Sequence, residues 1–173
     1  MPAKSEGRSV RFKGQPLNLV GSAPVVGRPA PDFTVNRGDL SAARLADFKG
    51  RTCVLVSVPS LDTPVCDLEA KRFNQEAAGL GEDVAVAVIS MDLPFAQSRW
   101  CGAAGAKNIV ALSDFNEASF GRAYGVLIKE LRLLARAVFV VDRAGTLQYS
   151  QLVPELTNEP DYASVLDAIK KLR

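Results

Sequence analysis

CVLVSVPSLDTPVCDLEA, residues 53–70, passes from an apolar strand through a turn into a helix. Residues 53–58 form a short apolar run rich in valine, which predicts a buried strand. Pro59 and the polar residues after it predict a turn. The helix-like stretch that follows covers residues 65–78. A strand that leads directly into a helix is typical of a βαβ unit, so this segment indicates an α/β fold.

The rest of the chain continues this alternation of strand-like and helix-like stretches. The expected elements after the first helix are a strand at 84–90, a helix at 95–104, a strand at 109–112, a helix at 117–124, an antiparallel hairpin of 137–141 and 147–152, and a helix at 161–172. A βαβ core followed by a hairpin and a last helix is the outline of a thioredoxin-like domain. We therefore predict the α/β class with a thioredoxin-like fold.

A β-hairpin is expected before this core. Residues 10–13 and 16–20 are predicted to be extended and are joined by Gly14 and Gln15, which is the spacing of a hairpin with a two-residue turn. The segment RPAPDF, residues 28–33, is expected to be extended because residues that precede proline avoid the helical region. It would connect the hairpin to the main domain.

The length and composition favour one compact domain, since 173 residues with 47% hydrophobic content can bury a sizeable core. Within it we expect an N-terminal extension with the hairpin at 1–27 and a thioredoxin-like domain at 28–173. The net charge is +2 and the 21 basic residues are scattered, so no nucleic acid or membrane partner is predicted. No apolar run approaches the roughly 20 residues of a membrane span, and no secretory signal is visible. We expect a cytoplasmic protein.

The chain contains no histidine, which removes the usual general base, the commonest metal ligand and the proximal haem ligand. Three cysteines remain, at positions 53, 66 and 101, and no two of them form a C-x-x-C pair. We therefore expect no metal and no other cofactor. Any cysteine chemistry must use isolated thiols.

Cys66 is predicted to lie at the start of a helix. Thr63 suits the N-cap and Pro64 the first helical position, which puts Cys66 at the third. A helix N-terminus and a charged hydrogen-bond donor together can lower the pKa of a thiol from about 8.5 to about 6.5. Neighbouring carboxylates would oppose this effect: Asp62, Asp67 and Glu69. A reactive thiolate here thus requires a nearby arginine, and the alternative is a thiol that only packs under the first helical turn.

The residues PSLDTPVC, 59–66, resemble the P-x-x-x-T-x-x-C active-site loop of peroxiredoxins. The similarity extends from about Val10 to the C-terminus and points to the bacterial thiol peroxidase branch of that family. It is carried by the Cys101 position, by LARA at 134–137, by SQLV at 150–153 and by EPDY at 159–162. The resemblance implies that Cys66 attacks the peroxide, Thr63 hydrogen-bonds in the pocket, Pro59 shields it, and Arg136 stabilises the thiolate.

The resemblance also implies an activity, which is the reduction of hydrogen peroxide and organic hydroperoxides to water and alcohols. Attack leaves Cys66 as a sulfenic acid, which further peroxide converts to the irreversible sulfinic form unless a second thiol condenses with it. In the family that thiol matches Cys101, the disulfide forms within one subunit, and thioredoxin reduces it. The family further implies a homodimer.

Other interpretations remain open for single residues. Arg136 could be a solvated residue at a sheet edge, and Cys101 a buried thiol beside Trp100. Cys53, in its alternating apolar strand, is expected to be core packing only. We expect the helix of Cys101 to be opened by Asp92 and Pro94 and to be weak at its glycine-rich end, so that one or both cysteine sites unfold locally on oxidation.

Two other functions compete with a peroxidase. In the first, the protein is a peroxide sensor or disulfide relay that passes its oxidised state to a partner instead of turning over. In the second, it is a thioredoxin-like binding domain whose cysteines are incidental core residues.

Overall fold

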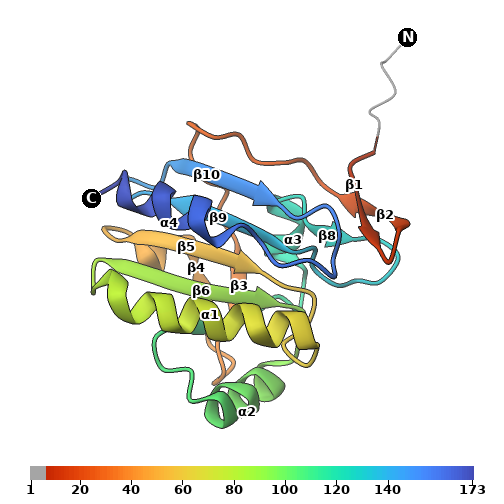
Figure 1. Cartoon of the computed structure of the whole chain (residues 1–173), viewed down its shortest axis with the longest axis horizontal. Coiled ribbons are helices and arrows are strands. Elements are labelled where there is room, and N and C mark those ends of the chain that lie inside the picture. The colour runs from red at the N-terminus through yellow and green to blue at the C-terminus, as the bar shows by residue number, and fades with distance from the viewer. Residues whose placement is uncertain (1–6) are drawn as a thin grey trace.

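A mixed β-sheet forms the centre of the computed structural model, which describes residues 7–173 (Figure 1). Within these residues the sheet has seven strands, which are, in order across it, β10 (Leu147–Leu152), β9 (Ala137–Val141), β5 (Thr52–Ser57), β6 (Val84–Ser90), β7 (Val110–Ser113), β3 (Thr34–Asn36) and β4 (Ala42–Arg44). The strands β5, β6 and β7 pair in parallel, as the predicted βαβ rhythm requires. The remaining neighbours pair antiparallel. The predicted α/β class is confirmed.

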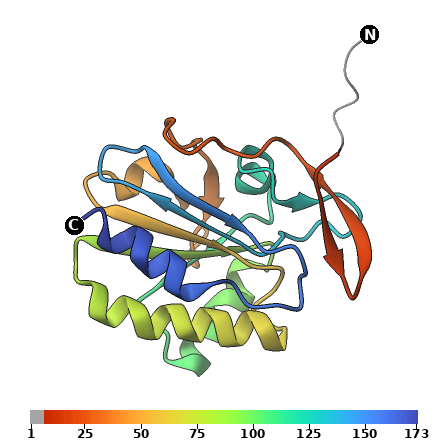
Figure 2. The same cartoon turned by 45° about the horizontal axis from the view of Figure 1, so that its top comes forward.

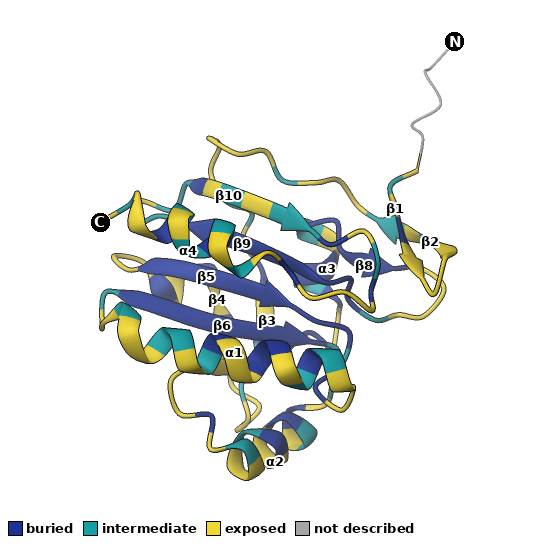
Figure 3. Cartoon of the chain, viewed as in Figure 1, coloured by how far each residue is buried: buried dark blue, intermediate teal, exposed yellow. Residues whose placement is uncertain are grey.

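Helices cover both faces of this sheet, so its central strands are buried on both sides (Figure 3). On one face lie α1 (Pro64–Leu80) and α4 (Tyr162–Lys170), and on the other the short α3 (Ser119–Ala123) (Figure 2). Side chains alternate along β5, so Val54 and Val56 pack towards α1 and α4 while Cys53 and Leu55 face the other core. Burial on both faces explains why β5 is continuously apolar in sequence.

The predicted hairpin is present at the same end of the molecule as the start of α1 (Figure 1). It consists of β1 (Ser9–Phe12) and β2 (Gln15–Val20), and in the described chain it forms a three-stranded sheet with β8 (Leu127–Ile128). The predicted turn was wrong by one residue. Phe12 pairs with Gln15, so the turn residues are Lys13 and Gly14. Both have positive φ, 49° and 80°, which is the geometry of a two-residue hairpin turn that matches the strand twist.

The helix α2 (Pro94–Ala104) begins with Leu93, not Asp92, at its N-cap. Asp92 precedes the N-cap by one residue, and its carboxylate accepts hydrogen bonds from the loop that precedes α1. The helix α3 is shorter than the predicted 117–124 because Ala118 takes the left-handed conformation, with φ of 53°, immediately before it. A 3-10 helix, η1 (Leu45–Phe48), follows β4 and was not predicted. None of the helices in residues 7–173 is both long and apolar enough to span a membrane.

Candidate active site

Cys66 occupies the third position of α1, as predicted, with Thr63 at the N-cap and Pro64 at the first position. Its side chain is fully buried. The Thr63 side chain makes no capping hydrogen bond within the described structure. Its hydroxyl instead donates to the carbonyl of Ser60 at 2.8 Å, which tightens the turn before the helix. The thiol therefore lies in the first turn of a helix, where negative charge is favoured.

The loop that carries Cys66 is anchored to the strand next to it. Asp92, which follows β6, accepts hydrogen bonds from the Ser60 hydroxyl at 2.7 Å and from the Leu61 backbone N–H at 2.8 Å. The hydroxyl of Ser90 donates to the same carboxylate at 2.7 Å. Pro59 is buried at the start of this loop. The position of Cys66 is thus set by the end of β6 as well as by its own helix.

Arg136 is the arginine that the reactive interpretation of Cys66 requires. The residue is 1% exposed, so the alternative of a solvated edge residue is wrong. The Nη2 donates to the Cys66 Sγ at 3.4 Å. The contact follows from the sheet register, because Ala137 pairs with Ser57 at the end of β5 and so places Arg136 beside the loop that leads to Cys66.

Glu69 forms a buried ion pair with the Nη1 of Arg136. Glu69 was considered only as a carboxylate that opposes a thiolate, but it lies one helical turn from Cys66 and binds the same arginine. Burial raises the pKa of Glu69 to about 7, although the arginine charge acts to lower it. Its Oε1 has no hydrogen-bond partner among residues 7–173. The spacing of three residues indicates from the sequence that Cys66 and Glu69 share one face of the helix, but it does not identify Arg136 as the partner of Glu69.

The guanidinium of Arg136 is also held by a backbone carbonyl. Its Nε and Nη2 donate to the oxygen of Leu156 at 3.2 and 2.8 Å. Burial lowers the pKa of Arg136, but its charge interactions and hydrogen bonds with Glu69 and Cys66 outweigh that effect, so the net shift is upward and the side chain stays charged. No sequence signal identifies Leu156, because any residue type offers the same carbonyl.

A cavity of about 480 Å³ opens onto this arrangement. Four groups of residues line it: the Cys66 loop and helix start (Pro59, Thr63, Pro64 and Val65), the hairpin (Phe12 and Lys13), the segment after β8 (Leu131 and Leu133), and Arg136 with Leu156 and Thr157. Most of the lining side chains are apolar. The cavity therefore has a mostly apolar lining with two basic side chains, Lys13 and Arg136, and Arg136 contacts the thiol of Cys66.

Cys101 lies on α2, about one turn before Gly105, whose left-handed conformation ends the helix. It is partly exposed, and burial raises the pKa of its thiol. Cys66 and Cys101 are both free thiols in the part of the chain that the structure describes. They pack against the same apolar cluster, Cys66 within it and Cys101 at its margin.

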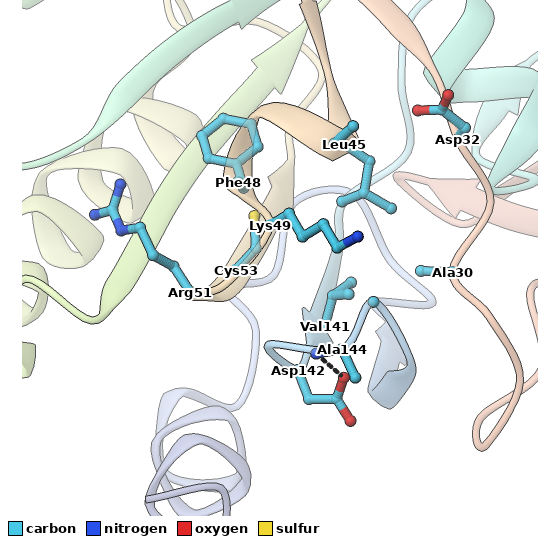
Figure 4. Close-up of a pocket in the computed structure, with 12 residues that line it drawn as sticks. Ala30, Asp32, Leu45, Phe48, Lys49, Arg51, Cys53, Val141, Asp142 and Ala144 are labelled. Carbon is cyan, nitrogen blue, oxygen red and sulfur yellow. Dashed lines mark hydrogen bonds between the residues drawn. The ribbon is translucent and has the colours of Figure 1, made fainter.

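Cys53 lies away from this site, in a smaller cavity of about 230 Å³ beside the start of β5 (Figure 4). Phe48, Lys49 and Arg51 surround it there. Burial raises the pKa of Cys53 to about 12. Its packing agrees with the expectation of a core residue. Across residues 7–173 no group of three or more Cys, Asp or Glu side chains is arranged to hold a metal ion.

This chain is similar in sequence to a known family and to known proteins. Residues 25–166 match the model of the redoxin family. The thiol peroxidase of Bacillus subtilis (strain 168) is 53% identical over 163 residues, which are 94% of this chain and 97% of that protein. The thiol peroxidase of Oceanobacillus iheyensis is 52% identical over 163 residues, covering 94% of this chain and 99% of that protein.

Two solved structures have the same fold. The peroxiredoxin-like protein from Aquifex aeolicus superposes with a TM-score of 0.90 and 45% identity over 96% of this chain and 98% of that one. The thiol peroxidase from Chromobacterium violaceum gives a TM-score of 0.84 at 22% identity over 94% and 96% of the two chains. The predicted thioredoxin-like fold is thereby confirmed.

Proposed function

The chain belongs to the redoxin family and is a peroxidase of its thiol peroxidase branch, and we propose that Cys66 is the residue that attacks the hydroperoxide. The single observation that supports this assignment best is the contact of 3.4 Å between the Arg136 guanidinium and the Cys66 sulfur. A cation held this close favours the ionised form of the thiol, which is the nucleophilic form.

In the proposed first step the Cys66 thiolate bonds to one peroxide oxygen and the O–O bond breaks. The other oxygen leaves, takes up a proton and becomes water or an alcohol, while the sulfur becomes a sulfenic acid. Arg136 lines the cavity and stabilises the negative charge that moves from sulfur to the leaving oxygen. Because the Thr63 hydroxyl already donates to Ser60, it is available to accept a hydrogen bond from the peroxide O–H. Pro59 covers the site with an apolar surface.

Cys101 is the proposed resolving thiol. Its sulfur attacks the sulfenic acid, water leaves, and a disulfide joins the two cysteines. A dithiol of the thioredoxin type then reduces this disulfide and is itself oxidised. The partial exposure of Cys101 supports this role, because the second reductant must reach the disulfide.

The apolar lining of the cavity supports organic hydroperoxides as substrates alongside hydrogen peroxide. Phe12, Leu131, Leu133 and Leu156 all contribute to it. A volume of about 480 Å³ is in the range of cavities that hold small organic ligands. From the family resemblance we also propose that thioredoxin is the reductant and that the protein works as a homodimer in the cytoplasm.

The test is peroxide consumption by the parent protein, Cys66→Ser and Cys101→Ser, each with thioredoxin and its reductase. We expect no activity in Cys66→Ser. In Cys101→Ser we expect one fast reaction with peroxide followed by loss of thioredoxin-dependent turnover, and intact mass should show one disulfide only in the oxidised parent. Oxidation of the parent without turnover would favour the sensor. If neither thiol reacted with peroxide, the result would favour the alternative of a thioredoxin-like binding domain whose cysteines are incidental core residues.

A further inference from the structure

Glu155 joins two segments that are far apart in the sequence. It lies in the loop between β10 and α4, and its carboxylate accepts hydrogen bonds from the backbone N–H groups of Lys13, at 3.0 Å, and Gly14, at 3.1 Å. The hydroxyl of Thr157 donates to it as well, at 3.0 Å. These bonds, led by the one from Gly14, hold the pKa of Glu155 below its ordinary value. The carboxylate is therefore charged at neutral pH.

Backbone pairing beside Glu155 extends the same contact. The N–H of Arg11 donates to the Pro154 carbonyl at 2.7 Å, and the N–H of Leu156 donates to the Arg11 carbonyl at 2.9 Å. Arg11 and Glu155 thus form a parallel bridge between β1 and the 154–156 segment. The side chain of Glu155 continues this pairing past the end of β1 and into the hairpin turn.

The turn that Glu155 binds has a conformation that needs support. Lys13 has φ of 49°, in the left-handed region that a residue with a Cβ atom adopts at an energetic cost. With Gly14 at φ of 80°, both turn amides are directed to one carboxylate. A charged acceptor that binds two N–H groups at once stabilises this turn against alternatives.

The two joined segments are walls of the cavity described above. Phe12 and Lys13 line it from the hairpin, and Leu156 and Thr157 from the other segment. Glu155 lies between them but is not part of the lining. The part of the cavity next to Cys66, which we call the inner part, is lined by Pro59, Thr63 and Arg136. Its geometry does not depend on Glu155, because Arg136 keeps its ion pair with Glu69 and the Cys66 loop keeps its hydrogen bonds to Asp92.

We propose that Glu155 is a positioning residue that sets the substrate range of this peroxidase by fixing the hairpin against the 154–157 segment. The proposal rests on the function proposed above. An organic hydroperoxide fills the outer cavity and depends on both walls, whereas hydrogen peroxide is small enough to contact only the inner groups, Pro59, Thr63 and Arg136. Loss of the Glu155 bonds would therefore weaken the reaction with large substrates and spare hydrogen peroxide.

The experiment compares cumene hydroperoxide with hydrogen peroxide in thioredoxin-coupled kinetics of the full chain. For Glu155→Ala we expect kcat/KM for cumene hydroperoxide to fall about tenfold, through KM, and the value for hydrogen peroxide to change less than about twofold. Glu155→Gln keeps one acceptor oxygen and the size of the side chain, so its kcat/KM for cumene hydroperoxide should also fall, but by less. If Glu155→Ala does not fold, as judged by circular dichroism, Glu155→Gln carries the test.

The matched control is Asp142→Asn. Asp142 is also a carboxylate that accepts two turn amides, those of Ala144 at 3.0 Å and Thr146 at 2.9 Å, but its turn joins β9 to β10 at the other end of the sheet (Figure 1). For Asp142→Asn we expect no change in kcat/KM for either cumene hydroperoxide or hydrogen peroxide. An equal loss for both peroxides in the Glu155 variants, or no loss for cumene hydroperoxide, would overturn the proposal. A parent protein inert towards both peroxides would instead refute the proposed function.

Discussion

The indole Nε1 of Trp100 donates a hydrogen bond of 2.9 Å to the carboxylate of Asp67. Each residue is the chain neighbour of a cysteine, since Asp67 follows Cys66 and Trp100 precedes Cys101. The bond therefore fastens α2 to the start of α1 next to both thiols. Lys71 and then Trp100 hold the pKa of Asp67 below its ordinary value by hydrogen bonding, so the acceptor is charged. An exposed pair, Arg99 with Asp62, adds a second link at 3.7 Å.

Trp100→Phe should speed formation of the Cys66–Cys101 disulfide. The change keeps an apolar ring and deletes the N–H, so α2 separates from α1 more readily. Because Asp67 is 32% exposed, we expect a loss of about 1 kcal/mol, or about fivefold in rate. Quenched-flow mass spectrometry after a peroxide pulse measures this rate. Asp67→Ala should act likewise, whereas Lys71→Ala, which removes only an exposed partner of Asp67, should not. Parent-like disulfide formation in both Trp100→Phe and Asp67→Ala would refute the fastening role.

Arg136→Met should abolish fast peroxide reduction and destabilise the fold. The substitution leaves the buried carboxyl of Glu69 without its cation, which destabilises the fold because that group must then stay charged and unpaired or be held protonated. Urea denaturation measures the loss. The double variant Arg136→Met with Glu69→Gln should recover part of the stability but none of the activity, because it removes the unpaired charge without restoring the cation beside Cys66. Equal stability of the single and double variants would contradict this.

Stability should depend on pH through Glu69. Burial raises its folded-state pKa to about 7 from an ordinary 4.5. Between these values the folded protein keeps a proton that the unfolded chain releases, so this group's contribution to stability falls as the pH rises through that window. Relative to the parent, Glu69→Gln should gain up to about 3 kcal/mol in unfolding free energy between about pH 4.5 and about pH 8. The measurement is urea denaturation of both proteins across that range. A difference that does not change with pH would exclude this effect.

Cys53 should be inert in the folded protein. Its thiol is 1% exposed and its pKa is raised to about 12 by burial, so almost none is ionised at neutral pH. We expect iodoacetamide to modify Cys53 only after denaturation, as peptide mass mapping would show. Cys53→Ala should keep the peroxide rate of the parent and lose about 1 kcal/mol of stability by leaving a small void. Fast labelling of native Cys53 would show that its strand opens.

Much of the fold was predictable because continuous apolar runs mark buried strands. The predicted strands at 84–90, 137–141 and 147–152 have the bounds that the structure gives to β6, β9 and β10. Element boundaries that depend on the backbone conformation of a single residue were harder to predict. Lys13 is a turn residue with positive φ, which its residue type disfavours, so the sequence suggested Gly14 and Gln15 instead.

Among the functional residues, too, some features were predictable from local sequence and others were not. The position of Cys66 at a helix start follows from Thr63 and Pro64, which act over a few residues, and was predictable from local stereochemistry. Whether Arg136 was buried against Cys66 or exposed at a sheet edge could not be derived from those rules. The two residues are 70 positions apart, and their contact depends on β9 pairing with β5 in one register.

The sequence alone therefore determined which segments become strands and helices and which thiol lies at a helix start, because these depend on short-range sterics and on hydrophobic periodicity. Only the tertiary structure decided which charges meet. The ion pair of Arg136 with Glu69 and the bonds of Glu155 to the hairpin turn join residues 67 and more than 140 positions apart. Such contacts form where strand order and register bring distant segments together, and no local pattern encodes that distance.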